Sequence, residues 1–109
     1  DRPWGVAVDA PSGFDRGAYR NRTVPTRCPR VFERHSRWMT LAEWEQLGFH
    51  PQAGFWPQDK DKILATLLEP DGPGNTAYLL TGNYRAILDY NCSNFYAMGV
   101  GLLADQIQR

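Results

Sequence analysis

The stretch ILATLLEPDGPGNTAYLL, residues 63–80, decides the fold. Two apolar runs, 63–68 and 77–80, flank a segment rich in glycine, proline, aspartate and asparagine. Short apolar runs bounded by turn-forming residues are typical of buried strands joined by a loop. The stretch therefore predicts a β-hairpin with a long loop, its strands lying among residues 63–69 and 76–81.

The chain before this hairpin favours further short strands. WGVAV at residues 4–8 alternates large and small apolar side chains and is followed by the turn-forming sequence APSG at 10–13, which predicts a strand and a turn. Residues 14–38 mix arginines, prolines and isolated apolar residues without a clear period. Because Pro25 and Pro29 oppose a long helix, we expect short strand pieces joined by loops there.

One short helix is predicted before the hairpin. Thr40 and Glu43 have the spacing of a capping box, in which the hydroxyl caps the first turn and the glutamate reaches back to the cap amide. Gly48 can adopt the left-handed conformation that ends a helix. We expect a helix over residues 41–47, followed by a loop over residues 49–56.

After Gly82 the spacing of apolar residues becomes helical. Ser93 is a candidate N-cap for a final helix from about Asn94 onward. That helix has one apolar face, formed by Tyr96, Val100, Leu103 and Ile107. Small residues within it suggest close packing against another helix, so we expect the isolated chain to expose this face and to self-associate.

Length and charge limit the classes of function. A chain of 109 residues with 42% hydrophobic residues suits one small domain or a piece of a larger one. It begins at Asp1 without an initiator Met, and we expect it to belong to a longer protein. Twelve basic and 12 acidic residues give no net charge, which argues against a nucleic-acid partner. An arginine-rich run over residues 16–37 is either a solvated loop face or a surface for an anionic polymer.

No cofactor or metal site is predicted. The sequence contains no glycine-rich phosphate loop and no nucleophile elbow, and the acidic residues at 59–62 lack the glycine and distal glutamate of a calcium loop. Cys28 and Cys92 are too few for structural zinc. They are either two unpaired thiols or a disulfide, which only an oxidising compartment would permit.

The carboxylates give no catalytic site. Glycoside cleavage usually needs two carboxyl groups that flank the scissile bond. The candidates are Glu33, Glu43, Glu45, Glu69, Asp89 and Asp105. None has a convincing catalytic setting, so no catalytic residue is assigned.

Aromatic and polar side chains are concentrated near the C-terminal end. The group comprises Tyr90, Asn91, Ser93 and Tyr96. Aromatic faces, amides and hydroxyls together suit a sugar, whose C–H face stacks on a ring while its hydroxyl and acetamido groups accept hydrogen bonds. The alternative is structural: the tyrosines anchor a core, and Asn91 and Ser93 end one helix and cap the next.

The same region carries a family resemblance. NYRAILDYNCSNFYAMGV at residues 83–100 resembles the closing segment of the membrane-bound lytic murein transglycosylase B family, which runs N-F-x-A-I-x-x-Y-N-x-S-x-x-Y-A-x-A-V. WGVAV at 4–8 with PSGFD at 11–15, and LAEWEQLG at 41–48, are also similar to family motifs. The resemblance covers nearly the whole chain. It departs at Ala7, Asp89 and Gly99, and the arginine-rich residues 26–36 look like an insertion.

This resemblance implies an α+β fold: a β-rich accessory part over residues 1–80, then helices over 81–109 that belong to a lysozyme-like helical core. In that family one glutamate cleaves the bond between N-acetylmuramic acid and N-acetylglucosamine without water and leaves a 1,6-anhydro product. We expect that glutamate, with the rest of the catalytic domain, upstream of Asp1.

The resemblance also implies that Tyr90, Asn91, Ser93 and Tyr96 bind the substrate, that peptidoglycan glycan strands are the partner, and that the protein acts in the periplasm or at the outer membrane. The alternative is a stand-alone peptidoglycan-binding or interaction module without catalysis. The coding sequence upstream of Asp1 would discriminate between them.

Overall fold

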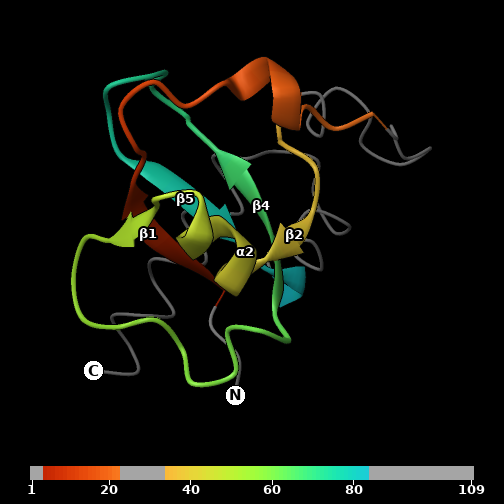
Figure 1. Cartoon of the computed structure of the whole chain (residues 1–109), viewed down its shortest axis with the longest axis vertical. Coiled ribbons are helices and arrows are strands. Elements are labelled where there is room, and N and C mark those ends of the chain that lie inside the picture. The colour runs from red at the N-terminus through yellow and green to blue at the C-terminus, as the bar shows by residue number, and fades with distance from the viewer. Residues whose placement is uncertain (1–3, 23–33, 84–109) are drawn as a thin grey trace.

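In the computed structural model, which describes residues 4–22 and 34–83, the chain forms a curled five-stranded antiparallel sheet with one short α-helix (Figure 1). The elements in chain order are β1 (Gly5–Asp9), the 3-10 helix η1 (Arg16–Tyr19), β2 (Met39–Thr40), α2 (Leu41–Gln46), β3 (His50–Pro51), β4 (Leu64–Leu68) and β5 (Ala77–Leu80). The strand order is β2-β4-β5-β1-β3. The described part is thus mostly β.

The predicted hairpin is confirmed. β4 and β5 pair antiparallel, with Thr66 opposite Leu80 and Leu68 opposite Tyr78. The connecting loop contains Gly72 and Gly74 with φ of 83° and 89°, values that favour glycine. The last four residues of β4 are all buried, and so are three of the four residues of β5. Burial on both faces explains why these sequences are apolar runs and not alternating patterns.

The predicted first strand is also confirmed, and it lies beside the last one. β1 pairs with β5 from Gly5 opposite Leu80 to Val8 opposite Ala77. A Cβ on Gly5 would lie 2.7 Å from Leu80 Cδ2 and 2.9 Å from the Leu79 carbonyl oxygen. The close approach of β1 to β5 therefore requires glycine at this position.

The capping box forms as predicted. The backbone amide of Glu43 donates to Thr40 Oγ1 at 3.2 Å, and the amide of Thr40 donates to Glu43 Oε1 at 3.0 Å. Leu47 is the C-cap, and Gly48 follows with φ of 106°. The helix expected over 41–47 is thus present as α2.

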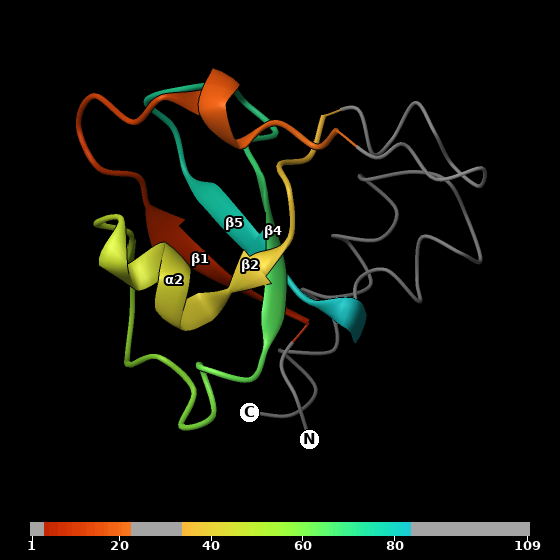
Figure 2. The same ribbon diagram turned by 45° about the vertical axis from the view of Figure 1, so that its right-hand side comes forward.

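Trp44 joins α2 to the sheet. Its side chain is fully buried, and the indole Nε1 donates to the Ala65 carbonyl in β4 at 3.1 Å. The Phe49 ring meets it edge-on at 5.2 Å, and the Phe14 ring meets Phe49 edge-on at 4.9 Å. Figure 2 shows α2 lying against the sheet beside β1 and β2. The rest of this core comprises Val8, Leu41, Ile63, Ala65, Leu67, Ala77 and Leu79.

Two sequence-based expectations were wrong. The loop predicted over residues 49–56 contains β3, which pairs with the end of β1. A strand of two residues is too short to produce an apolar pattern, so pairing with β1 and not local sequence defines it. Residues 16–19 form η1 where strand pieces were expected; Asp15 Oδ1 caps it by accepting from the Ala18 amide.

The fold class is confirmed in its β-rich part and in α2. Gly82 and Asn83, the last described residues, are helical, in agreement with the change of pattern at Gly82. The C-terminal helices, including the one expected from about Asn94, lie outside the described residues. The division at residue 80 remains a prediction.

Gly5→Ala should lower the free energy of unfolding by about 1–3 kcal/mol, because the new methyl group overlaps the β5 backbone and Leu80. Urea unfolding of the chain measures the change. Gly82→Ala is the matched control, since its Cβ would meet nothing within 4 Å. Equal midpoints for the two variants would contradict the tight β1–β5 contact.

Candidate functional site

The four residues predicted to bind sugar, Tyr90, Asn91, Ser93 and Tyr96, lie outside the described residues. So do Cys28 and Cys92. Their arrangement therefore stays a prediction. The described part of the chain presents a different concave site, which the sequence motifs did not reveal.

This site is a cavity of about 240 Å³ between η1, the segment 34–36 and the loop that joins β4 to β5. Its aromatic side chains are Phe14 and Tyr19, and its charged ones are Arg16, Arg20, Arg34 and Glu69. We call it the arginine cavity. Among the described residues that line it, three arginines and one glutamate give a formal excess of two positive charges.

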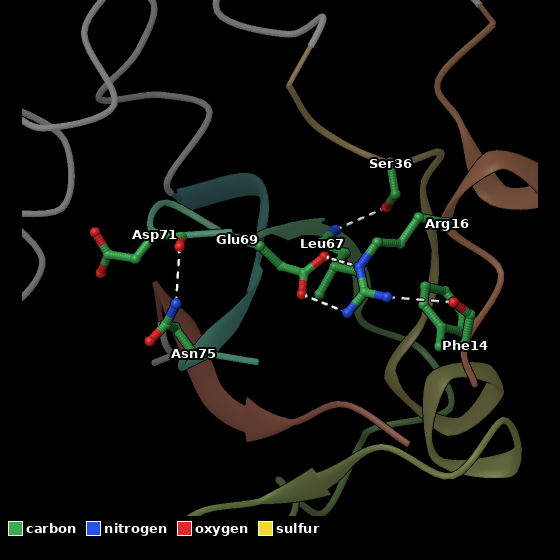
Figure 3. A network of polar contacts seen from close by, with 7 residues as sticks. All are labelled: Phe14, Arg16, Ser36, Leu67, Glu69, Asp71 and Asn75. Carbon is green, nitrogen blue, oxygen red and sulfur yellow. Dashed lines mark hydrogen bonds and ion pairs between the residues drawn. The ribbon is translucent and has the colours of Figure 1, made fainter. Parts of the chain in front are cut away.

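An ion pair between Arg16 and Glu69 lies in the wall of the arginine cavity (Figure 3). Arg16 Nε donates to Glu69 Oε1 at 2.5 Å and Nη2 donates to Oε2 at 2.8 Å. This two-pronged geometry is the strong form of an arginine–carboxylate contact. The hydrogen bond to Glu69 raises the pKa of Arg16 above its usual value, against the opposing effect of burial. The pair ties η1 to the end of β4.

The aromatic side of the cavity is also fixed. The Phe14 and Tyr19 rings stack at 5.2 Å. Arg16 lies over the Phe14 ring at 5.7 Å, and its Nη1 donates to the Phe14 carbonyl at 3.3 Å. Arg37 lies over the Tyr19 ring at 5.3 Å, and its Nη2 donates to the Ala18 carbonyl at 2.6 Å. These contacts keep both rings in place without a ligand.

Ser36 fastens the third side of the cavity to β4. The Leu67 amide donates to Ser36 Oγ at 2.8 Å, and the Ser36 amide donates to the Leu67 carbonyl at 3.0 Å. Thr66 Oγ1 donates to the Ser36 carbonyl at 2.7 Å. Ser36 also forms an isolated antiparallel bridge with Arg20. The backbone that carries Arg20 and Arg34 is therefore held by the sheet.

Arg20 and Arg34 differ from Arg16 in their surroundings. Both are exposed, and within residues 4–22 and 34–83 neither forms an ion pair with an acidic side chain. Their guanidinium groups are free to contact a molecule in the cavity. Arginine is well suited to planar anionic groups, because its fork of donors matches a carboxylate or phosphate.

The described glutamates all have structural partners. Glu43 closes the capping box, Glu45 accepts from Lys60 Nζ at 2.6 Å, and Glu69 pairs with Arg16. Each carboxylate thus has a structural role, and its hydrogen bonds or ion pair disfavour a second role as a general acid. Over the described residues, no group of three His, Cys, Asp or Glu side chains is placed to hold a metal ion.

A second hollow, of about 390 Å³, lies where the described chain ends. Trp38 and Leu64 give it an apolar wall, and Lys62, Thr81 and Asn83 add polar groups. Leu64 is 53% exposed, which is unusual for a leucine in the middle of a sheet.

Comparison with known proteins identifies the family. A family model described as the Transglycosylase SLT domain matches residues 1–105. The chain belongs to the lytic transglycosylase family. Its structure is similar to SltB3 from Pseudomonas aeruginosa, with 34% sequence identity over 98% of this chain and TM-scores of 0.76 and 0.75 to two crystal structures. Those structures contain NAG-NAM-pentapeptide and NAG-anhNAM-pentapeptide, respectively.

The chain spans about a quarter of SltB3, since the match covers 25% of that protein. No curated protein matches the chain significantly. The family assignment confirms the resemblance seen in the sequence at the level of the lytic transglycosylases. In the described segments, no helix is long and apolar enough to cross a bilayer.

Arg16→Gln should destabilise the chain more than Glu69→Gln. The Glu69 side chain is 11% exposed and would keep an uncompensated charge, whereas the Arg16 side chain is 37% exposed and water can solvate it. Losing a hydrogen-bonded partner of a poorly hydrated charge costs about 2 kcal/mol, and we expect about half of that for Glu69→Gln. Urea midpoints of the two variants give the order. The reverse order would show that Glu69 is adequately hydrated without Arg16.

Proposed function

We propose that this chain is the C-terminal part of a lytic murein transglycosylase, which cleaves the bond between N-acetylmuramic acid and N-acetylglucosamine in peptidoglycan. The observation that carries the proposal is the combined match: the family model covers residues 1–105, and a relative with 34% identity over 98% of the chain has been crystallised with peptidoglycan fragments. One of those fragments is the anhydro form, NAG-anhNAM-pentapeptide, which is the kind of product this reaction leaves.

The proposed reaction consumes no water. A glutamic acid protonates the glycosidic oxygen, and the bond between that oxygen and C1 of N-acetylmuramic acid breaks. The 6-hydroxyl of the same sugar then bonds to C1 and gives its proton to the glutamate, which restores the acid. We assign this glutamate to the part of the enzyme upstream of Asp1. The structural roles of Glu43, Glu45 and Glu69 support that assignment.

The chain's own contribution is to bind the glycan. Tyr90, Asn91, Ser93 and Tyr96 match the family motif position by position, and we propose that they line the cleft near the catalytic acid. Residues 1–80 would form the accessory part, and residues 81–109 would return to the helical core. Because peptidoglycan lies in the cell envelope, we place the enzyme in the periplasm or at the outer membrane.

The rival function is a glycan-binding module without chemistry. The partial coverage of SltB3, 25% of its length, is compatible with a chain that works without a catalytic domain. Turnover separates the two functions, because a binding module releases no product.

The 109-residue chain alone should not cleave murein, whereas the whole enzyme should release products that end in 1,6-anhydro-N-acetylmuramic acid. Mass spectrometry of the soluble products after incubation with purified murein makes the comparison. Anhydro products from the chain alone would overturn the placement of the catalytic acid. An inactive whole protein that still binds murein would favour the binding module.

In the whole enzyme, Asn91→Ala should lower the rate of murein turnover by about 10²–10³, the usual cost of losing one preorganised donor in the transition state. A residue that merely ends a helix would instead cost about 0.5–2 kcal/mol in folding and leave the turnover rate of the folded protein intact. Turnover is measured beside the urea midpoint.

Asn75→Ala is the matched control for Asn91→Ala. Asn75 is an exposed loop residue whose amide donates to the Asp71 carbonyl at 2.8 Å, so its loss should leave turnover unchanged. If Asn91→Ala shifts only the midpoint, as a structural asparagine would, the proposed sugar-facing role of this motif fails.

A further inference from the structure

The arginine cavity has no part in the proposed cleavage reaction, yet its surroundings are those of a binding site. Its walls come from three separate segments of the chain. Hydrogen bonds and ring contacts fix these walls, and two rim arginines remain without an acidic partner among the described residues. The site is therefore preorganised, which reduces the ordering cost of binding.

The charges define the class of ligand. Arg16 neutralises Glu69 through two hydrogen bonds, so the carboxylate does not oppose an incoming anion. Arg20 and Arg34 supply the remaining positive charge. A guanidinium group forms its best contacts with planar anions such as carboxylates.

The volume of the arginine cavity and its two aromatic rings restrict the class of ligand further. A volume of about 240 Å³ is below the roughly 300–1,000 Å³ of pockets for drug-sized molecules. It suits one amino-acid residue better than a chain of sugars. The stacked rings of Phe14 and Tyr19 offer an apolar surface beside the arginines. An apolar wall next to a cationic rim fits a small aliphatic residue that bears a carboxylate.

We propose that the arginine cavity binds a carboxylate-bearing residue of the peptide attached to the glycan strand, with Arg20 and Arg34 as the contacting residues. The inference rests on the proposed function, since peptidoglycan supplies the peptide. It goes beyond that function because it gives the accessory part a ligand of its own. The enzyme would thereby favour strands that carry peptides over bare strands.

Titration calorimetry of the 109-residue chain with free pentapeptide of the peptidoglycan type tests the cavity without any sugar. We expect binding that weakens as salt rises, because exposed charges are screened. The double variant Arg20→Gln/Arg34→Gln should bind at least about tenfold more weakly, in line with the loss of charge-assisted hydrogen bonds. Peptide with its carboxylates converted to amides should bind wild-type chain as weakly as the double variant binds the acid.

Arg22→Gln is the matched control, because Arg22 is an exposed arginine that does not line the arginine cavity. It should bind the pentapeptide like wild type. Equal binding by wild type and double variant, or equal binding of acid and amide, would overturn the proposal. Inorganic phosphate that binds as tightly as the peptide would show a general anion site and would also overturn it.

Measuring murein turnover by the whole enzyme distinguishes a failure of the peptide-binding proposal from a failure of the proposed function. If the whole enzyme cleaves murein but the pentapeptide does not bind, only the cavity's ligand is wrong. If the pentapeptide binds as expected but the enzyme releases no anhydro product, the cavity stands and the proposed reaction fails.

Discussion

The burial of Trp44 is the constraint on which the rest of the described fold depends. Its ring packs against Phe49 and lies near Phe14 and Tyr19, and its indole donates to a backbone carbonyl of β4. A buried indole N–H without an acceptor would be costly. The hydrogen bond from Trp44 therefore fixes the distance between α2 and the sheet. Through Phe14 and Tyr19 it also positions η1, and with η1 one wall of the arginine cavity. The core and the cavity are therefore coupled.

Features with local causes could be predicted from the sequence, and features with distant causes could not. The capping box at Thr40 and the hairpin over 63–80 are encoded by neighbouring residues, and both formed as expected. The ion pair of Arg16 and Glu69 joins residues 53 positions apart. No local sequence pattern around either residue predicts this contact. β3 is likewise defined by its antiparallel pairing with β1, a segment distant in the sequence. The proposed sugar-binding residues came from family resemblance, and they lie beyond the described part.

The described residues of this member of the lytic transglycosylase family do not have the character of a catalytic site. Its described glutamates cap a helix or form ion pairs, while two of its exposed arginines, Arg20 and Arg34, line a cavity. Such a division of roles is physically reasonable. A general acid needs an environment that keeps it protonated near neutral pH, whereas the contact between arginine and carboxylate works best when both groups are charged. If both proposals hold, cleavage and peptide recognition would occupy separate sites in one enzyme.

A crystal structure of the whole enzyme with NAG-NAM-pentapeptide bound tests this division most directly. The account predicts that the sugars lie beside Tyr90 and Asn91, near a glutamate from upstream of Asp1, while a peptide carboxylate contacts Arg20 and Arg34. A ligand whose sugars and peptide both lie away from this chain would contradict the central claim that the chain is a substrate-binding part of the enzyme.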